Sequence, residues 1–267
     1  MKTRIKTISS FILLFIESIL LFVLTCLLMS KFTVLNASYV KDKLEKNNYY
    51  QDLYNEILTE MSYYTNQSGF EDSILENTFT LGEVRYETNK FIENTYKGKS
   101  LTIDTSKVKE RLRKNIDNFI NNSSFKVVDK KEIDKFVETM SDIYQDEIRL
   151  MGYAEKGAGF ITKVTSLSNK LIIVLSVAII LLFLINSILL KRKDFSVVLY
   201  TSSFILLFVN YYIKNNIDIK NIFVYSPLVS KIAKNMVNNI FNIFIIVAII
   251  YIVIGVILGL FKKIKKS

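Results

Sequence analysis

The sequence predicts an all-α integral membrane protein with four transmembrane helices and a helical extracytoplasmic domain inserted between the first and the second span. Half of the 267 residues are apolar, and they are concentrated in long blocks, whereas a soluble domain spreads them periodically. A block of about 18 apolar residues is long enough to cross the roughly 30 Å hydrocarbon core as a helix. The second observation is the placement of the basic residues.

The net charge of +10 comes mostly from three short segments at the N-terminus, at 191–194 and at the C-terminus. Their basic residues are Lys2, Arg4, Lys6, Lys191, Arg192, Lys193, Lys262, Lys263, Lys265 and Lys266. The long segment 31–168 is almost balanced in charge. Four spans with a cytoplasmic N-terminus place all three clusters in the cytoplasm, as basic flanking segments prefer. The charge therefore indicates topology, and we expect no nucleic-acid partner.

The first apolar block, at about 8–29, follows a basic start and contains one charge, Glu17. Its length exceeds that of a signal-peptide core, which favours an uncleaved span over a signal peptide. Cys26 is the only cysteine, which rules out an intramolecular disulfide. It resembles a lipoprotein cysteine only weakly, because the apolar run continues past it, and we expect it to pack as a small hydrophobic residue.

The domain organisation follows from these signals. Residues 1–30 form a basic cytoplasmic start and the first transmembrane helix, residues 31–168 form the extracytoplasmic helical domain, and residues 169–267 form spans two to four. The last region includes a short cytoplasmic loop at 191–194, an outer loop at 214–238 and a basic cytoplasmic tail. The predicted location is the cell membrane, with both termini in the cytoplasm.

Apolar residues recur at three- and four-residue intervals within 31–168, which predicts four or five amphipathic helices. Ser38 is a candidate cap for a first helical stretch that breaks near Asn47 and Asn48. Thr80 and Glu83 have capping-box spacing, and Gly98 is a stop signal for the helix they open. Further apolar stripes follow Ser106 and Asp129. The glycine-containing stretch 152–160 predicts a flexible neck.

Three further apolar blocks lie at about 171–190, 195–213 and 240–261. The short connection between the first two predicts an antiparallel helical hairpin. Ser226 and Pro227 are a favoured cap and first-turn residue, so the last helix is expected to begin there with an amphipathic section.

The chain has no histidine, which excludes histidine-dependent catalytic triads and histidine-containing zinc sites. No phosphate-binding glycine loop occurs. We therefore expect no enzyme, no catalytic residue, no cofactor and no metal. Asp142, Asp146 and Glu147 could bind a hard cation, but they lack calcium-loop spacing and are better interpreted as solvated helix faces. Several tyrosines between residues 49 and 64 fit helix packing better than a binding platform.

The candidate site residues lie within the spans. Glu17 could be a proton-relay or gating carboxylate, or it could accept structural hydrogen bonds from Asn186, Asn210 or Ser203. Gly255 and Gly259 form a GxxxG pattern that allows close helix contact within the bundle or between copies of the chain, as a homo- or hetero-oligomer.

Two segments carry a resemblance to a known group. SYVKDKLEKNNYYQDLYNEILTEM (38–61) and FTLGEVRYETNKFIENTYKGKSLTID (79–104) resemble the outer regions of uncharacterised four-span membrane proteins of low-GC Gram-positive bacteria. That resemblance implies an architecture and no activity. The order of one span, a large outer domain and three spans is also similar to FtsX-like and MacB-like permeases, which relay ATPase strokes. The short KRKD connection and the following segment depart from those permeases.

Two functions fit the sequence. The first is a non-enzymatic binding, interaction or sensing module outside the cytoplasm, anchored in the lipid bilayer by four spans and directed at an unknown protein or envelope partner. The alternative is an accessory or permease-like subunit of a transport complex that uses Glu17 and other polar residues of the spans.

Overall fold

The computed structural model describes residues 2–99, 102–122, 129–149, 153–188, 195–216 and 226–264. These residues form nine α-helices and one 3-10 helix, with no strand among them. In chain order the elements are α1 (Lys2–Phe32), α2 (Ala37–Lys46), α3 (Tyr49–Gln67), η1 (Asp72–Leu75), α4 (Leu81–Lys97), α5 (Ser106–Asn122), α6 (Lys130–Ile148), α7 (Tyr153–Ile188), α8 (Phe195–Asn216) and α9 (Pro227–Ile264). The all-α prediction is confirmed for the described residues.

The chain divides into two compact units. The membrane unit consists of residues 1–35 and 164–267, and the helical unit consists of residues 36–163. Four helices are long and apolar enough to cross a membrane, in the ranges Thr7–Phe32, Gly159–Ile188, Phe195–Asn216 and Pro227–Lys262. This number of membrane-capable helices agrees with the prediction and indicates a multi-pass membrane protein.

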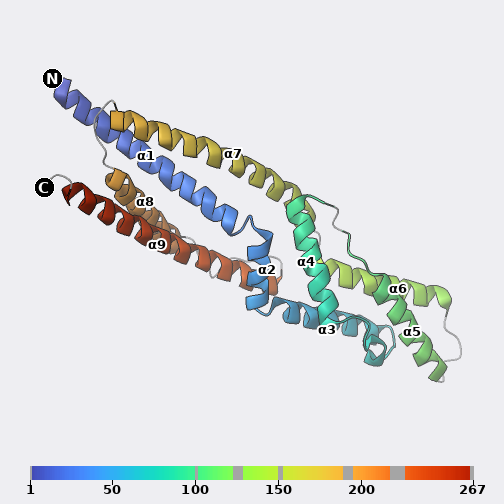
Figure 1. Cartoon of the computed structure of the whole chain (residues 1–267). Helices are drawn as coiled ribbons and strands as arrows, with labels where there is room; N and C mark the ends of the chain where they lie inside the picture. The colour runs from blue at the N-terminus through green and yellow to red at the C-terminus, as the bar shows by residue number, and fades with distance from the viewer. Residues whose placement is uncertain are drawn as a thin grey trace. The chain divides into compact units, whose positions relative to one another are not determined.

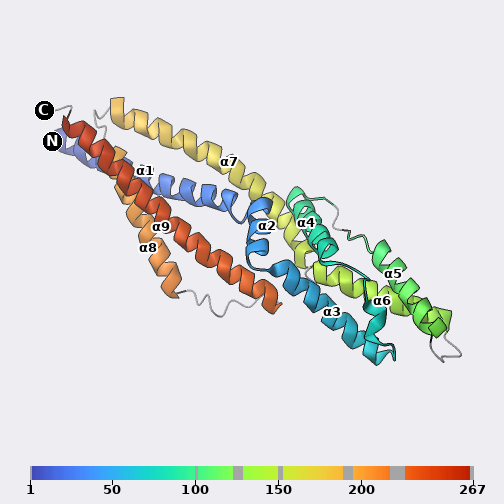
Figure 2. The same cartoon turned by 60° about the horizontal axis from the view of Figure 1, so that its bottom comes forward.

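Within the membrane unit, α8 packs against both α9 and α1, and Figures 1 and 2 show α8 and α9 side by side. Large apolar side chains point outward along α7 and α9; Ile173, Ile180, Ile249 and Val253 are examples. Polar side chains such as Glu17 and Ser202 are buried instead. This distribution is typical of helices that face lipid, where hydrogen bonds and close packing join the spans.

Within the helical unit, α3 contacts α2, α4, α6 and η1, whereas α5 packs on α6 and η1 (Figure 1). Each helix contributes an apolar stripe to one core, as the three- and four-residue spacing predicts. The most deeply buried apolar residues are Leu53, Ile57, Met61, Ile74, Val84, Leu112, Ile116, Val137, Met140, Tyr144 and Ile148.

Several predicted helix ends are confirmed. Thr80 and Glu83 form a complete capping box at the start of α4, and Gly98 ends that helix with φ +63°, a left-handed conformation that glycine adopts without steric cost. The break near Asn48 separates α2 from α3. The Leu228 backbone N–H donates to Ser226 Oγ at 3.2 Å at the start of α9.

Two local predictions are wrong. Asn36, rather than Ser38, caps α2, because its side chain accepts from the backbone N–H groups of Ser38 and Tyr39. The stretch predicted as a flexible neck is helical from Tyr153 onward as part of α7. Each glycine in a helix interior costs only about 1 kcal/mol. The long apolar helix therefore extends N-terminally through the glycines of this stretch.

Some predicted segments lie outside the described residues. They are the cytoplasmic loop 191–194, residues 217–225 of the outer loop 214–238, and residues 265–267 of the basic tail. The sidedness of the helical unit, the division at 31 and 168, and the cytoplasmic location of both termini stay predictions.

Candidate functional sites

Glu17 lies in the interior of the membrane unit and is fully buried. Asn186 of α7 donates from Nδ2 to Glu17 Oε2 at 3.2 Å. The two other predicted partners bind elsewhere, since Ser203 Oγ donates to the Ala248 carbonyl at 2.9 Å. Asn210 Nδ2 donates to the Phe241 carbonyl at 3.1 Å. The structure thus brings Glu17 and Asn186 together and places Asn210 in the α8–α9 contact.

Helix α1 is hydrogen-bonded to each of the other three spans. Besides the bond from Asn186, Ser202 Oγ of α8 donates to the Ser18 carbonyl at 2.9 Å. Thr25 Oγ1 and the Tyr251 hydroxyl of α9 lie 2.6 Å apart. Such bonds join spans because lipid offers the polar groups no alternative partner. The polar residues of the spans therefore organise the membrane unit around α1.

The two glycines of the GxxxG pattern differ in their surroundings. A Cβ atom added at Gly255 would lie 2.7 Å from Cε1 of Tyr200 on α8, so the tyrosine ring or the helix would have to shift to accept a side chain there. A Cβ atom added at Gly259 would have nothing within 4 Å. Gly255 thus allows the ring of Tyr200 to reach the α9 backbone, whereas the space beside Gly259 is open among the described residues.

The helical unit contains a polar pocket between η1, the segment that follows it, and α5, which we call the η1–α5 pocket. Its volume is about 550 Å³. Its lining residues are Ser73, Ile74, Glu76, Asn77, Arg111, Lys114, Asn115, Asn118, Phe119 and Asn122. Because α5 presents its apolar stripe to the core, the flank of the helix beside that stripe supplies most of these polar side chains.

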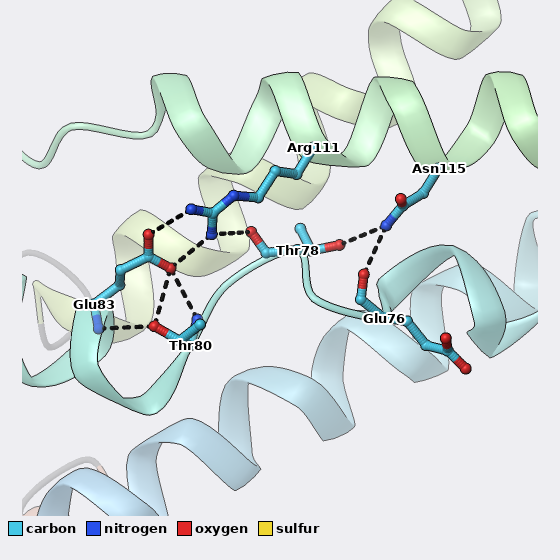
Figure 3. Close-up of polar contacts among 6 residues, drawn as sticks. All are labelled: Glu76, Thr78, Thr80, Glu83, Arg111 and Asn115. Atoms are coloured by element: carbon cyan, nitrogen blue, oxygen red, sulfur yellow. Dashed lines mark hydrogen bonds and ion pairs between the residues drawn. The ribbon is translucent and has the colours of Figure 1, made fainter.

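Arg111 fixes one wall of the η1–α5 pocket. Its guanidinium donates to both carboxylate oxygens of Glu83 at 2.8 Å and to the Thr78 carbonyl at 3.4 Å (Figure 3). Glu83 also accepts from the Thr80 backbone N–H at 2.9 Å. The same carboxylate therefore takes part in the helix cap and in the ion pair with Arg111. The hydrogen bonds from Arg111 hold the pKa of Glu83 below its usual range.

Asn115 fixes the floor of the same pocket. Its side-chain nitrogen donates to the carbonyls of Ile74 at 2.9 Å and Glu76 at 2.8 Å, as Figure 3 shows for Glu76. The next residue, Asn77, has φ +56°, a left-handed conformation that asparagine tolerates better than most residues. Arg111 and Asn115 thus hold the segment between η1 and α4 against α5.

A second row of side chains in the pocket is exposed to solvent. Lys114, Asn118 and Asn122 follow one another at four-residue intervals along α5, and all three are exposed. Asparagine amides both donate and accept hydrogen bonds, while the lysine contributes a positive charge. This row is suited to a polar ligand that offers hydroxyl, amide or anionic oxygen groups.

A pair of acidic side chains joins α6 to α3 in the helical unit. Glu147 is only 7% exposed. Burial is the main cause that raises its pKa to about 8, and the hydrogen bond with Glu60 and the charge of Glu56 add to it. The buried position of Glu147 and its acidic neighbours therefore favour the protonated form of its carboxyl group. The prediction of a solvated face is wrong for Glu147, although Asp142 and Asp146 are exposed.

The Arg111–Glu83 pair and the approach of Glu147 to Glu60 were not predictable from the sequence. Both join residues far apart in the chain, and periodicity alone does not reveal which polar residues meet. Most of the predicted packing tyrosines do pack: Tyr49 and Tyr50 are buried, and Tyr64 stacks on Phe136 with ring centroids 5.7 Å apart. Tyr63 is 67% exposed.

Neither a known protein family, nor a curated protein, nor a solved structure matches this chain. The resemblance to four-span proteins of Gram-positive bacteria stays a prediction. Among the described residues, no group of three or more Asp, Glu or Cys side chains could hold a metal ion.

Proposed function

We propose that this protein is a multi-pass membrane protein whose helical unit lies outside the cytoplasm and binds a partner from the envelope or another protein. The observation that supports this function best is the η1–α5 pocket, in which Arg111 and Asn115 hold the walls and an exposed polar row faces solvent. A preformed concave site with converging polar groups is the usual form of a binding site. The four spans anchor the unit.

The basic clusters support the proposed orientation. Cationic segments remain in the cytoplasm, whereas a charge-balanced segment is translocated more readily. The helical unit contains the balanced part of the sequence. The partner therefore binds from the outer side, and the α1-centred polar contacts keep the spans together while it does so.

Site-specific photocrosslinking in living cells tests the proposed binding site. A photoreactive amino acid is introduced at Asn118, inside the η1–α5 pocket, and at Glu110, which is exposed on the same helix outside the pocket. We expect an adduct of defined mass from Asn118 and none from Glu110. Equal adducts from both positions, or none from Asn118, would contradict the proposal.

A charge-reversal pair sharpens this test. Lys114→Glu is expected to lower the yield of the Asn118 adduct at least several-fold, because it replaces the cation of the polar row with an anion. Lys107→Glu makes the same change at an exposed position of α5 outside the pocket and serves as the matched control. Equal losses with both variants would show that general surface charge, and not the pocket, controls capture.

The alternative function is a subunit of a transport complex, and the buried Glu17 favours it, since ionisable residues within spans are commonly functional. Purification of the complex in mild detergent separates the two functions. An ATPase that co-purifies in fixed proportion would favour the transport complex, whereas envelope proteins captured through Asn118 would favour the binding module.

A further inference from the structure

Glu17 and Asn186 form an incomplete pair of polar groups inside the membrane unit. They are 0% and 1% exposed. The bond from Asn186 Nδ2 to Glu17 Oε2 uses one oxygen of the carboxyl group. The other oxygen, Glu17 Oε1, and the amide oxygen, Asn186 Oδ1, have no hydrogen-bond partner among the described residues. Both are acceptors, so each requires a donor.

No cation of the surrounding spans can serve as that donor. The stretches 8–30, 171–188, 195–213 and 235–261 contain no lysine or arginine, and Glu17 is their only charged residue. Their other titratable groups are Cys26 on α1, three tyrosines on α8 at 200, 211 and 212, and Tyr251 on α9. A buried carboxylate without a cation is strongly unfavourable, and neutralisation by a proton removes that penalty.

We propose that Glu17 is a proton-binding site and that the protonated carboxyl group forms a neutral acid–amide pair with Asn186. The hydroxyl at Oε1 donates to Oδ1, while Nδ2 donates to Oε2, so that two hydrogen bonds close a ring between α1 and α7. A hydronium ion of the solvent supplies the proton and becomes water, so one O–H bond forms on Glu17 and one breaks on hydronium. A single proton thus satisfies both unpartnered oxygens.

The proton also holds α7 against α1. Its loss leaves a carboxylate oxygen facing the amide oxygen, and two acceptors without a shared hydrogen repel each other. The pair joins α7 to the other spans at a fully buried position, so the release of the proton would loosen this contact. The hydrogen ion is therefore the ligand that this site of the membrane unit takes.

Infrared spectroscopy of the full chain in lipid nanodiscs tests the proposal at neutral pH. The spectrum of the Glu17→Gln variant is subtracted from that of the native protein. We expect the carbonyl band of a protonated carboxylic acid in the difference, and its loss from the variant. Carboxylate bands in its place would overturn the proposal. Glu147→Gln, measured in the same way, separates the signal of Glu147 from that of Glu17.

The Asn186→Leu variant keeps the proposal testable if Glu17→Gln does not fold. Without the amide, the Glu17 hydroxyl loses its acceptor, so its carbonyl band is expected to move to higher frequency. An Asn210→Leu variant removes an amide that does not contact Glu17 and serves as the matched control. A band that stays in place in the Asn186→Leu protein would overturn the acid–amide pair.

Discussion

The membrane unit and the helical unit use the same secondary structure and distribute polar and apolar residues in opposite ways. In the helical unit, Ile57 and Leu112 are buried, while the ion pairs lie at or near the surface. In the membrane unit, Ile173 and Ile180 are exposed, while Glu17 and other polar residues are buried. The difference shows that the surrounding solvent, water or lipid, decides which residues join the helices.

The largest expected effect tests this difference with one substitution in two places. Ile57→Ala removes a fully buried side chain from the core of the helical unit and should cost about 2–5 kcal/mol. Ile180→Ala truncates an exposed residue of α7 and should have a much smaller effect. This side chain faces apolar lipid or detergent whether or not the spans are packed together, so its truncation removes little packing. Thermal unfolding of the full chain in detergent compares them. Equal effects would contradict the assignment of the two solvents.

The second effect is a pH dependence that belongs to the helical unit. Folding raises the pKa of Glu147 from the ordinary 4.5 to about 8, so the folded unit binds one more proton between these values. The stability contributed by this group is complete below pH 4.5 and is lost as the pH rises toward 8. The midpoint of thermal unfolding should accordingly fall by several degrees over this window.

The Glu147→Gln variant isolates that contribution. The amide can still donate to Glu60 and does not titrate, so the variant should be more stable than the native protein at pH 8 and less dependent on pH. Asp142→Asn is the control, since Asp142 is exposed on the same helix. An unchanged pH profile in the Glu147→Gln protein would exclude the acidic pair as the cause.

The third effect concerns the start of α4. Thr80→Ala removes the oxygen that accepts from the Glu83 backbone N–H at 3.2 Å, and the loss of such a cap typically costs about 1 kcal/mol. Thr80→Ser keeps the hydroxyl and should retain most of the stability. Chemical denaturation measures both variants, and a full loss in the serine variant would show that the methyl group matters instead.

The positions of the helices were easier to predict from the sequence than the hydrogen-bond partners of the polar side chains. Capping residues such as Thr80 act on backbone groups within one turn, so their spacing predicts the helix end directly. The neighbours Asp146 and Glu147 look alike in the sequence, yet one is exposed and the other is buried, because the rotation of α6 against α3 decides it. Glu17 was recognisable by its apolar surroundings, whereas the choice of Asn186 over Asn210 required the arrangement of the spans.

The smallest effect is expected for a single hydrogen bond between spans. Ser203→Ala removes the bond from Ser203 Oγ to the Ala248 carbonyl and should cost about 0.6 kcal/mol, the average for such bonds in a membrane. Unfolding in mixed micelles can detect this change. A cost several times larger would mean that polar contacts stabilise this unit more strongly than packing does.

An outward-facing binding unit requires that the helical unit and the C-terminal end of α9 lie on opposite sides of the membrane. The substitution Cys26→Ser removes the single cysteine of the chain. In that background, either Glu110→Cys or Lys262→Cys introduces one new thiol, which is labelled with a membrane-impermeant reagent. We expect intact cells to label Glu110→Cys and to label Lys262→Cys only after permeabilisation. Labelling of Lys262→Cys in intact cells, or protection of Glu110→Cys, would contradict an outward-facing binding unit.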